Sequence, residues 1–167
     1  SVGIELSQGE LDAPLDTARN PASYAMKDPF NLRGGFDRSL KPGSRPALLV
    51  VDFQRGFTEP GLSPLASDCS AAVSATAELI RAFRGLGPVI FTVIGYAPNL
   101  SDVGRWIDKC SALDTLIRGT PACELDPRLA HSPDDAVITK TQASAFFGTP
   151  LATMLAAARC DMLVVAG

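Results

Sequence analysis

Four short apolar runs along the chain predict strands that are buried on both faces. In "PALLVVDFQ", the residues from Ala47 to Val51 are all apolar, without the alternation that a half-exposed strand shows. Similar runs occur in "VIFTVIGY" at 89–96, "DAVITK" at 135–140 and "DMLVVAG" at 161–167. Continuous apolar runs of this length are typical of strands inside a parallel sheet.

Two amphipathic segments between these runs predict helices. Between Ala72 and Leu86, apolar residues recur at helical spacing, and glycines and a proline follow. A second helix is predicted after "TQASAFFGT", with Thr149 as its N-cap, Pro150 at its first position and one apolar face beginning at Leu151. This alternation predicts an α/β fold: a doubly wound, mostly parallel sheet with helices on both faces.

The pattern divides the chain into two parts. Residues 1–45 mix acidic, Asn, Gly and Pro positions without sustained periodicity, and we interpret them as an N-terminal arm. Residues 46–167 contain all the predicted elements and form the α/β domain. Because a buried fourth strand normally leads into a covering helix, we expect this domain to be incomplete at its C-terminal end and the protein to continue past Gly167.

Composition and charge then narrow the function classes. Hydrophobic residues make up 46% of the 167, enough for a sizeable core. Lys and Arg total 15 against 18 Asp and Glu, a net charge of −3, so no broad basic surface is available for nucleic acid or an anionic membrane. A small-molecule partner is therefore expected. No signal-type or membrane-spanning stretch is present in the sequence, which favours a cytoplasmic protein.

The cysteines and the histidine give no metal or disulfide pattern. Four cysteines are widely spaced without a Cys-x-x-Cys pair, and His131 is the only histidine. We interpret the cysteines as reduced thiols that mostly serve packing, and His131 as a surface residue. Neither a metal nor a cofactor is expected.

Candidate chemistry lies where the predicted strands end. Asp52 closes the first run, Lys140 closes the third, and the small residues Ala166 and Gly167 end the fourth. In open parallel sheets, ligands bind beyond the carboxyl ends of the strands. We therefore expect Asp52 and Lys140 to lie on neighbouring strands with their side chains in one crevice. Taken singly, each residue could also be a turn residue or half of a structural ion pair.

Three segments resemble a known family. "ALLVVDFQRGF", "VITKTQASAFFGTPL" and the terminal "LVVAG", in this order and at these separations, resemble the isochorismatase-like cysteine hydrolases, nearest the branch of N-carbamoylsarcosine amidase and maleamate amidase. The resemblance runs from about Pro46 to Gly167. Its most specific part is the spacing of Lys140, Ser144, Ala145 and Phe146.

The resemblance implies an Asp, Lys and Cys triad in which Asp52 and Lys140 supply the first two members. In the family, the cysteine lies in the loop after the strand that matches "LVVAG", and none of the four cysteines here has an equivalent place. The implied reaction is hydrolysis of a small acyclic amide through a thioester, with release of ammonia. Phe57, Trp106 and Ser144 are candidate substrate-binding residues. Relatives that bind a metal use an Asp-x-His arrangement, which "DFQRGFTEPGLSPL" lacks.

Other readings stay open at this point. One is an isochorismatase-type vinyl ether hydrolase, which keeps the Asp and Lys but need not keep the Cys. Another is a catalytically silent binding domain of the same fold, with no reactive thiol. The family and the long arm favour a homo-oligomer, with a tetramer as the expected state.

Overall fold

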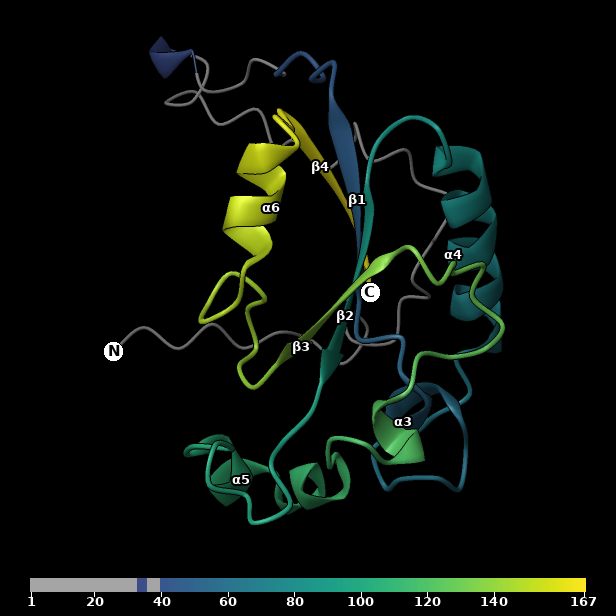
Figure 1. The fold of residues 1–167 in the computed structure, drawn as a ribbon, viewed down its shortest axis with the longest axis vertical. Helices are drawn as coiled ribbons and strands as arrows, with labels where there is room; N and C mark the ends of the chain where they lie inside the picture. Colours follow the sequence, from purple (N-terminus) through teal and green to yellow (C-terminus); the bar gives the residue numbers. More distant parts are fainter. Residues whose placement is uncertain (1–32, 36–39) are drawn as a thin grey trace, which may run out of the picture. The chain divides into compact units, whose positions relative to one another are not determined.

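The four predicted strands form one parallel sheet (Figure 1). The computed structural model describes residues 33–35 and 40–167. Strands β1 (Pro46–Val51), β2 (Val89–Ile94), β3 (Ala136–Lys140) and β4 (Met162–Ala166) lie in the order β3-β2-β1-β4, and every pairing is parallel. The prediction of a mostly parallel α/β sheet is confirmed.

The apolar runs of β1 and β2 are continuous because helices cover both faces in the middle of the sheet. The prediction of burial on both faces was wrong for the outer strands, where Val137 of β3 is 49% exposed and Val165 of β4 is 59% exposed. Helix α4 (Ser70–Phe83) lies on one face and α6 (Leu151–Ala157) on the other (Figure 1). Side chains alternate along a strand, so Leu48 and Val50 of β1 belong to the core under α4, while Leu49 belongs to the core under α6. Both cores exclude water from the middle of the sheet.

The predicted helix bounds are close to the observed ones, with small corrections. The first helix begins at Ser70 and ends at Phe83, before Gly85, which adopts a left-handed φ of 87°. The second begins at Leu151 with Pro150 as its N-cap, so the predicted cap at Thr149 is one residue early. Thr149 still helps the helix to start, because its Oγ1 accepts a hydrogen bond from the Leu151 N–H at 3.2 Å.

Short helical segments gather beyond the carboxyl ends of β1 and β2. They are α3 (Arg55–Thr58), α5 (Trp106–Lys109) and the 3-10 turns η2 (Ser111–Thr115) and η3 (Pro121–Cys123), seen in the lower part of Figure 1. A third apolar cluster around Tyr96, Leu113 and Leu116 holds them together. The strand ends therefore open onto a packed layer rather than onto bulk water.

Most of the predicted arm, residues 1–45, lies outside the described residues, which include only 33–35 and 40–45 of it, so the arm stays a prediction. Residues 44 and 45 are described: Ser44 and the Arg45 N–H both donate hydrogen bonds to the carboxylate of Asp161, just before β4. Among the described helices, none is long and apolar enough to cross a bilayer.

Candidate active site

Asp52 and Lys140 meet at the carboxyl edge of the sheet. The Lys140 Nζ donates to the Asp52 Oδ2 at 2.8 Å across 88 residues of sequence. The expectation that their strands are neighbours was wrong, because β2 lies between β1 and β3. The long lysine side chain spans the intervening strand, so the two groups still share one crevice.

Neighbouring polar groups fix both members of the pair. The Asp52 Oδ1 accepts a hydrogen bond from the Thr92 hydroxyl at 3.1 Å, and Thr92 is fully buried in β2. Lys140, 1% exposed, donates its remaining N–H bonds to the carbonyls of Gln142 and Ala143, each at 3.2 Å. Because all three N–H bonds of the ammonium have acceptors, the Lys140 side chain keeps one position, with its positive charge next to the Asp52 carboxylate.

The backbone at Asp52 is itself unusual. Its φ is 60°, in the left-handed region that residues other than glycine seldom adopt. A hydrogen bond from the Asp52 N–H to the Thr92 carbonyl, at 3.0 Å, holds this conformation at the end of β1. Such backbone strain is concentrated at functional sites, where the surrounding structure enforces it.

The pair borders a cavity of about 210 Å³. Its walls combine the two charged groups with mostly apolar side chains, from Asp52, Ile94, Tyr96, Trp106, Leu113, Lys140, Thr141 and Ala143. The ends of β1, β2 and β3 supply Asp52, Ile94 and Lys140, and α5 and η2 supply Trp106 and Leu113. This is the composition of a small-molecule site: a few placed polar groups in an apolar pocket.

The candidate substrate-binding residues divide into two groups. Trp106, at the start of α5, lines the cavity with 46% of its surface exposed. Phe57 and Ser144 are not among the lining residues. Phe57 packs against the apolar cluster that contains Tyr96 and Leu113. Ser144 is exposed, and its Oγ accepts a hydrogen bond from the Phe146 N–H at 3.2 Å.

Two further residues shape the site although sequence reasoning gave them no role. Gln54 is fully buried; its Nε2 donates to the Ile94 and Ala122 carbonyls, both at 2.9 Å, and its Oε1 accepts from the Ile94 N–H at 2.6 Å. It ties the end of β2 to η3. The available signal was a polar residue three positions after the end of a buried strand.

Tyr96 is the second of these residues. It is 2% exposed and follows β2 by two positions, inside the apolar run that predicted the strand. Burial raises the pKa of its hydroxyl, and the negative charges of Asp102 and Asp52 raise it further. The hydroxyl is therefore held in its neutral form.

The cysteines of this chain lie outside the cavity lining. All four are free and half-buried. Cys123 donates its thiol to the Ile94 carbonyl at 3.3 Å, and burial raises its pKa. A raised pKa lowers the thiolate fraction, which is the opposite of what a nucleophilic cysteine needs.

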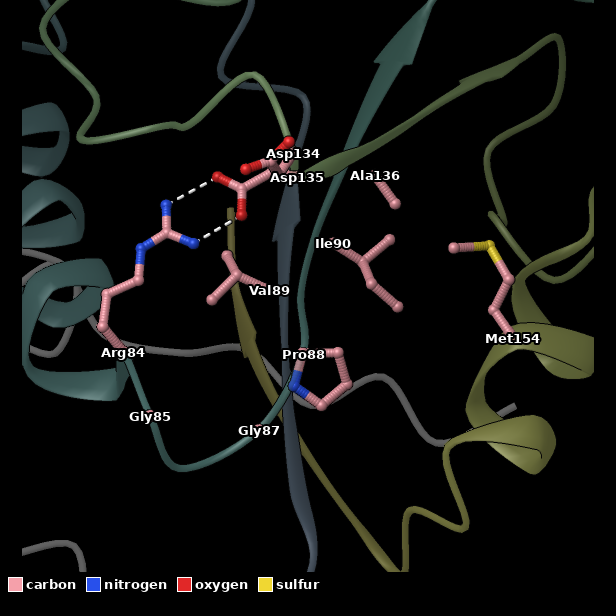
Figure 2. A pocket seen from close by; sticks show the side chains of 10 residues that line it. All are labelled: Arg84, Gly85, Gly87, Pro88, Val89, Ile90, Asp134, Asp135, Ala136 and Met154. Atoms are coloured by element: carbon pink, nitrogen blue, oxygen red, sulfur yellow. Dashed lines mark hydrogen bonds and ion pairs between the residues drawn. The ribbon is translucent and has the colours of Figure 1, made fainter.

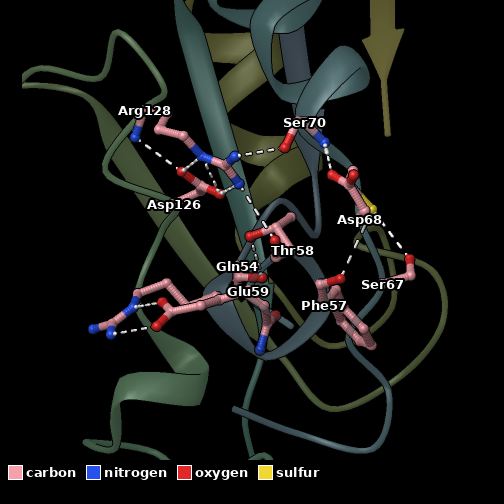
Figure 3. A network of polar contacts seen from close by, with 11 residues as sticks. Gln54, Phe57, Thr58, Glu59, Ser67, Asp68, Ser70, Asp126 and Arg128 are labelled. Atoms are coloured by element: carbon pink, nitrogen blue, oxygen red, sulfur yellow. Dashed lines mark hydrogen bonds and ion pairs between the residues drawn. The ribbon is translucent and has the colours of Figure 1, made fainter. Parts of the chain in front are cut away.

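The described residues include no group of three or more His, Cys, Asp and Glu side chains that could hold a metal ion. The acidic groups instead pair with arginines. Around 450 Å³ of open space borders Asp68, Asp126 and Arg128, and the hydrogen bonds of that network are drawn in Figure 3. Arg128 contacts Asp126, the Ser70 hydroxyl and the Thr58 carbonyl, so this network joins the segment that holds Asp126 and Arg128 to the end of α3 and the start of α4.

A separate hollow of about 370 Å³ lies at the opposite edge of the sheet, where β2 and β3 begin (Figure 2). Two of its charged residues are already paired with each other, since Arg84 binds both carboxylate oxygens of Asp135. The combination of a carboxylate, an ammonium and apolar walls is found beside Asp52 and Lys140, which makes that cavity the candidate active site.

Comparison with known proteins identifies the family of the chain. The isochorismatase domain model matches residues 46–167. Over 139 residues the chain is 35% identical to the maleamate amidohydrolase of Pseudomonas putida, an alignment that covers 82% of this chain and 65% of the relative. Over 164 residues it is 30% identical to the N-carbamoylsarcosine amidase of an Arthrobacter species, covering 95% and 61%. The chain thus spans less than two thirds of the length of these relatives.

Solved structures agree with the sequence matches. A cysteine hydrolase from Pseudomonas syringae pv. phaseolicola superimposes with a TM-score of 0.68 at 30% identity, over 77% of this chain and 63% of that one. The N-carbamoylsarcosine amidase from Thermoplasma acidophilum gives 0.58 at 28% identity, over 72% and 66%. Given the domain match, the parallel sheet and the Asp and Lys pair at its carboxyl edge, the chain belongs to the isochorismatase family.

Proposed function

We propose that this chain is the part of an amidohydrolase that supplies the acid–base and ammonium groups for cleavage of a small acyclic amide. The observation that carries the proposal is the 2.8 Å contact between Lys140 and Asp52 at the wall of the 210 Å³ cavity. Two relatives named for amide hydrolysis support the reaction class. The cavity volume supports a small substrate, of the maleamate or N-carbamoylsarcosine kind.

The nucleophile in this proposal is a cysteine of the full-length protein, placed about half a dozen residues past Gly167 by the family resemblance noted above. A thiol beside an ammonium has a lowered pKa, because the positive charge stabilises thiolate. At an effective dielectric near 20, a unit charge about 4 Å away is worth on the order of 4 kcal/mol. Lys140 is the cation in the cavity wall that can supply this effect.

Amide hydrolysis by this site would proceed in three proposed steps. Asp52 accepts the thiol proton, and the thiolate attacks the amide carbonyl carbon to form a C–S bond. The tetrahedral intermediate collapses, the C–N bond breaks, and Asp52 returns the proton to the leaving nitrogen, so ammonia departs. Water then attacks the thioester, which releases the acid and restores the thiol. Thr92 and Lys140 hold the Asp52 carboxylate toward the reacting atoms throughout.

The test is ammonia release by the full-length protein from maleamate and from N-carbamoylsarcosine. We expect turnover of at least one, and a loss of at least 10³-fold in kcat for Asp52→Asn with an unchanged circular dichroism spectrum. Because the segment that begins at Asp52, "DFQRGFTEPGLSPL", contains no histidine to complete an Asp-x-His arrangement, EDTA should leave the rate unchanged. An Asp52→Asn enzyme with wild-type kcat would overturn the proposal.

A second candidate is hydrolysis of an isochorismate-type vinyl ether. It is favoured by one observation: the described residues that line the cavity include the Asp and Lys but no cysteine. Incubation of the full-length protein with isochorismate distinguishes the two reactions. Consumption of isochorismate together with failure on both amides would favour this candidate.

A further inference from the structure

The cavity wall contains a buried hydroxyl that the acid–base chemistry does not use. Tyr96 is 2% exposed, yet its hydroxyl donates to and accepts from no other described residue. Within the described part of the chain, no fully inaccessible polar side-chain atom lacks a hydrogen-bond partner. The Tyr96 hydroxyl must therefore retain some accessible surface, and the residue lines the cavity beside Asp52.

The other polar groups of the cavity are already engaged or can reach water. Lys140 uses its three N–H bonds on Asp52 and two carbonyls. Trp106 is 46% exposed and Thr141 is half-buried, so the indole N–H and the threonine hydroxyl have access to solvent. The Tyr96 hydroxyl has accessible surface in a residue that is otherwise buried and has no partner among the described residues, so it can bind a group that enters the cavity.

We propose that the Tyr96 hydroxyl is a substrate-binding donor that hydrogen-bonds to an oxygen of the amide substrate. The inference rests on the proposed amide hydrolysis and adds to it a residue that selects the substrate. The acceptor is a carbonyl or carboxylate oxygen, since the raised pKa keeps the hydroxyl protonated as a donor. The ring is held in place by Leu113, Leu116 and Val103, so the donor is pre-positioned.

The test is Tyr96→Phe in the full-length protein. Phenylalanine preserves the packing and removes only the oxygen, so we expect KM to rise about tenfold, the value of one neutral hydrogen bond, with kcat within twofold of wild type. The melting temperature should be equal or higher, because the hydroxyl has no hydrogen-bond partner among the described residues. A purely structural role would lower the melting temperature and leave KM unchanged, which would overturn the inference.

Ser63→Ala is the matched control. Its hydroxyl bonds inside the protein, to the Thr115 Oγ1 at 2.9 Å and to the Leu65 N–H at 3.1 Å, away from the cavity lining. We expect a lower melting temperature and an unchanged KM, the reverse of Tyr96→Phe.

A binding measurement separates this inference from the reaction. Maleate, the diacid that hydrolysis of maleamate leaves, is titrated into wild type and Tyr96→Phe by calorimetry. A Kd about tenfold weaker in the variant supports the Tyr96 donor even if no amide is turned over. Equal Kd values, or no binding of maleate, maleamate or N-carbamoylsarcosine to wild type, would contradict it.

Discussion

At the scale of single residues, the site depends on a backbone conformation that its neighbours enforce. Asp52 adopts a φ of 60°, which costs on the order of 1 kcal/mol for a residue other than glycine. Its backbone N–H and its carboxylate both bond to Thr92 of β2, and Lys140 completes the set. A carboxylate with fixed partners keeps one orientation, which general acid–base chemistry requires.

The lysine gives the first prediction. In the full-length protein, Lys140→Met removes the cation while largely preserving side-chain length, so the pKa of the proposed nucleophilic thiol should rise and alkylation by iodoacetamide at pH 7 should slow at least tenfold. The measurement is the alkylation rate against pH, with the modified peptide identified by mass spectrometry. Lys109→Met, an exposed lysine of α5, serves as the control and should leave the rate unchanged. Equal rates in all three proteins would contradict the role of Lys140.

At the scale of elements, two glycines in the turn from α4 to β2 serve different purposes. Gly85 has a φ of 87° and open space around the position of a Cβ. A Cβ at Gly87 would lie 1.9 Å from the Pro46 carbonyl oxygen, at the start of β1. The first glycine permits a conformation and the second permits a close approach of two chain segments.

These glycines form a matched pair of variants. Gly85→Ala should lower the free energy of unfolding by about 1 kcal/mol, the cost of a left-handed alanine. Gly87→Ala should lower it by more, about 3 kcal/mol, because the backbone of β1 or of the turn must shift. Urea unfolding followed by circular dichroism gives both values. If Gly85→Ala proved the more damaging, the close contact with Pro46 would not limit the turn.

At the scale of the whole molecule, the Asp126 and Arg128 network joins segments from three regions of the sequence (Figure 3). Asp126 is 1% exposed. Its burial acts to raise its pKa, but hydrogen bonds from Arg128, Thr58 and the Arg128 backbone N–H outweigh burial and lower the pKa to about 2. The folded state therefore prefers the charged carboxylate more than the unfolded chain does.

The consequence is a loss of stability in acid. A depressed pKa contributes stability that is fully present above the ordinary carboxylate pKa and is lost as the pH falls through the folded value. Between about pH 4 and pH 2, Asp126 should account for a decrease of about 2 kcal/mol in the free energy of unfolding. Asp126→Asn should flatten the curve in that window when unfolding by urea is measured at each pH. An equally steep curve in the variant would assign the acid sensitivity to other groups.

The sequence predicted all four strands because each is a short, nearly unbroken apolar run, although only β1 and β2 are buried along most of their length. It predicted that Asp52 and Lys140 share a crevice, since both close such runs. It could not predict the strand order, because an apolar run indicates burial and carries no information on which strands are neighbours. The position of β2 between the strands of Asp52 and Lys140 was therefore missed. Tyr96 was missed because a tyrosine within an apolar run resembles an ordinary core residue.

The strand order also determines when the site can assemble. Strand β1 is made first but lies between β2 and β4, so its second partner arrives only once residue 166 has been synthesised. The Asp52 and Lys140 contact closes a loop of 88 residues and must wait for β3. Long-range pairing of this kind slows folding, because loop entropy is lost before contacts repay it. On the ribosome, the central strand therefore has a single partner while the 72 residues from the end of β2 at 94 to the end of β4 at 166 are added, and the Asp52 carboxylate meets its lysine only after residue 140 has been made.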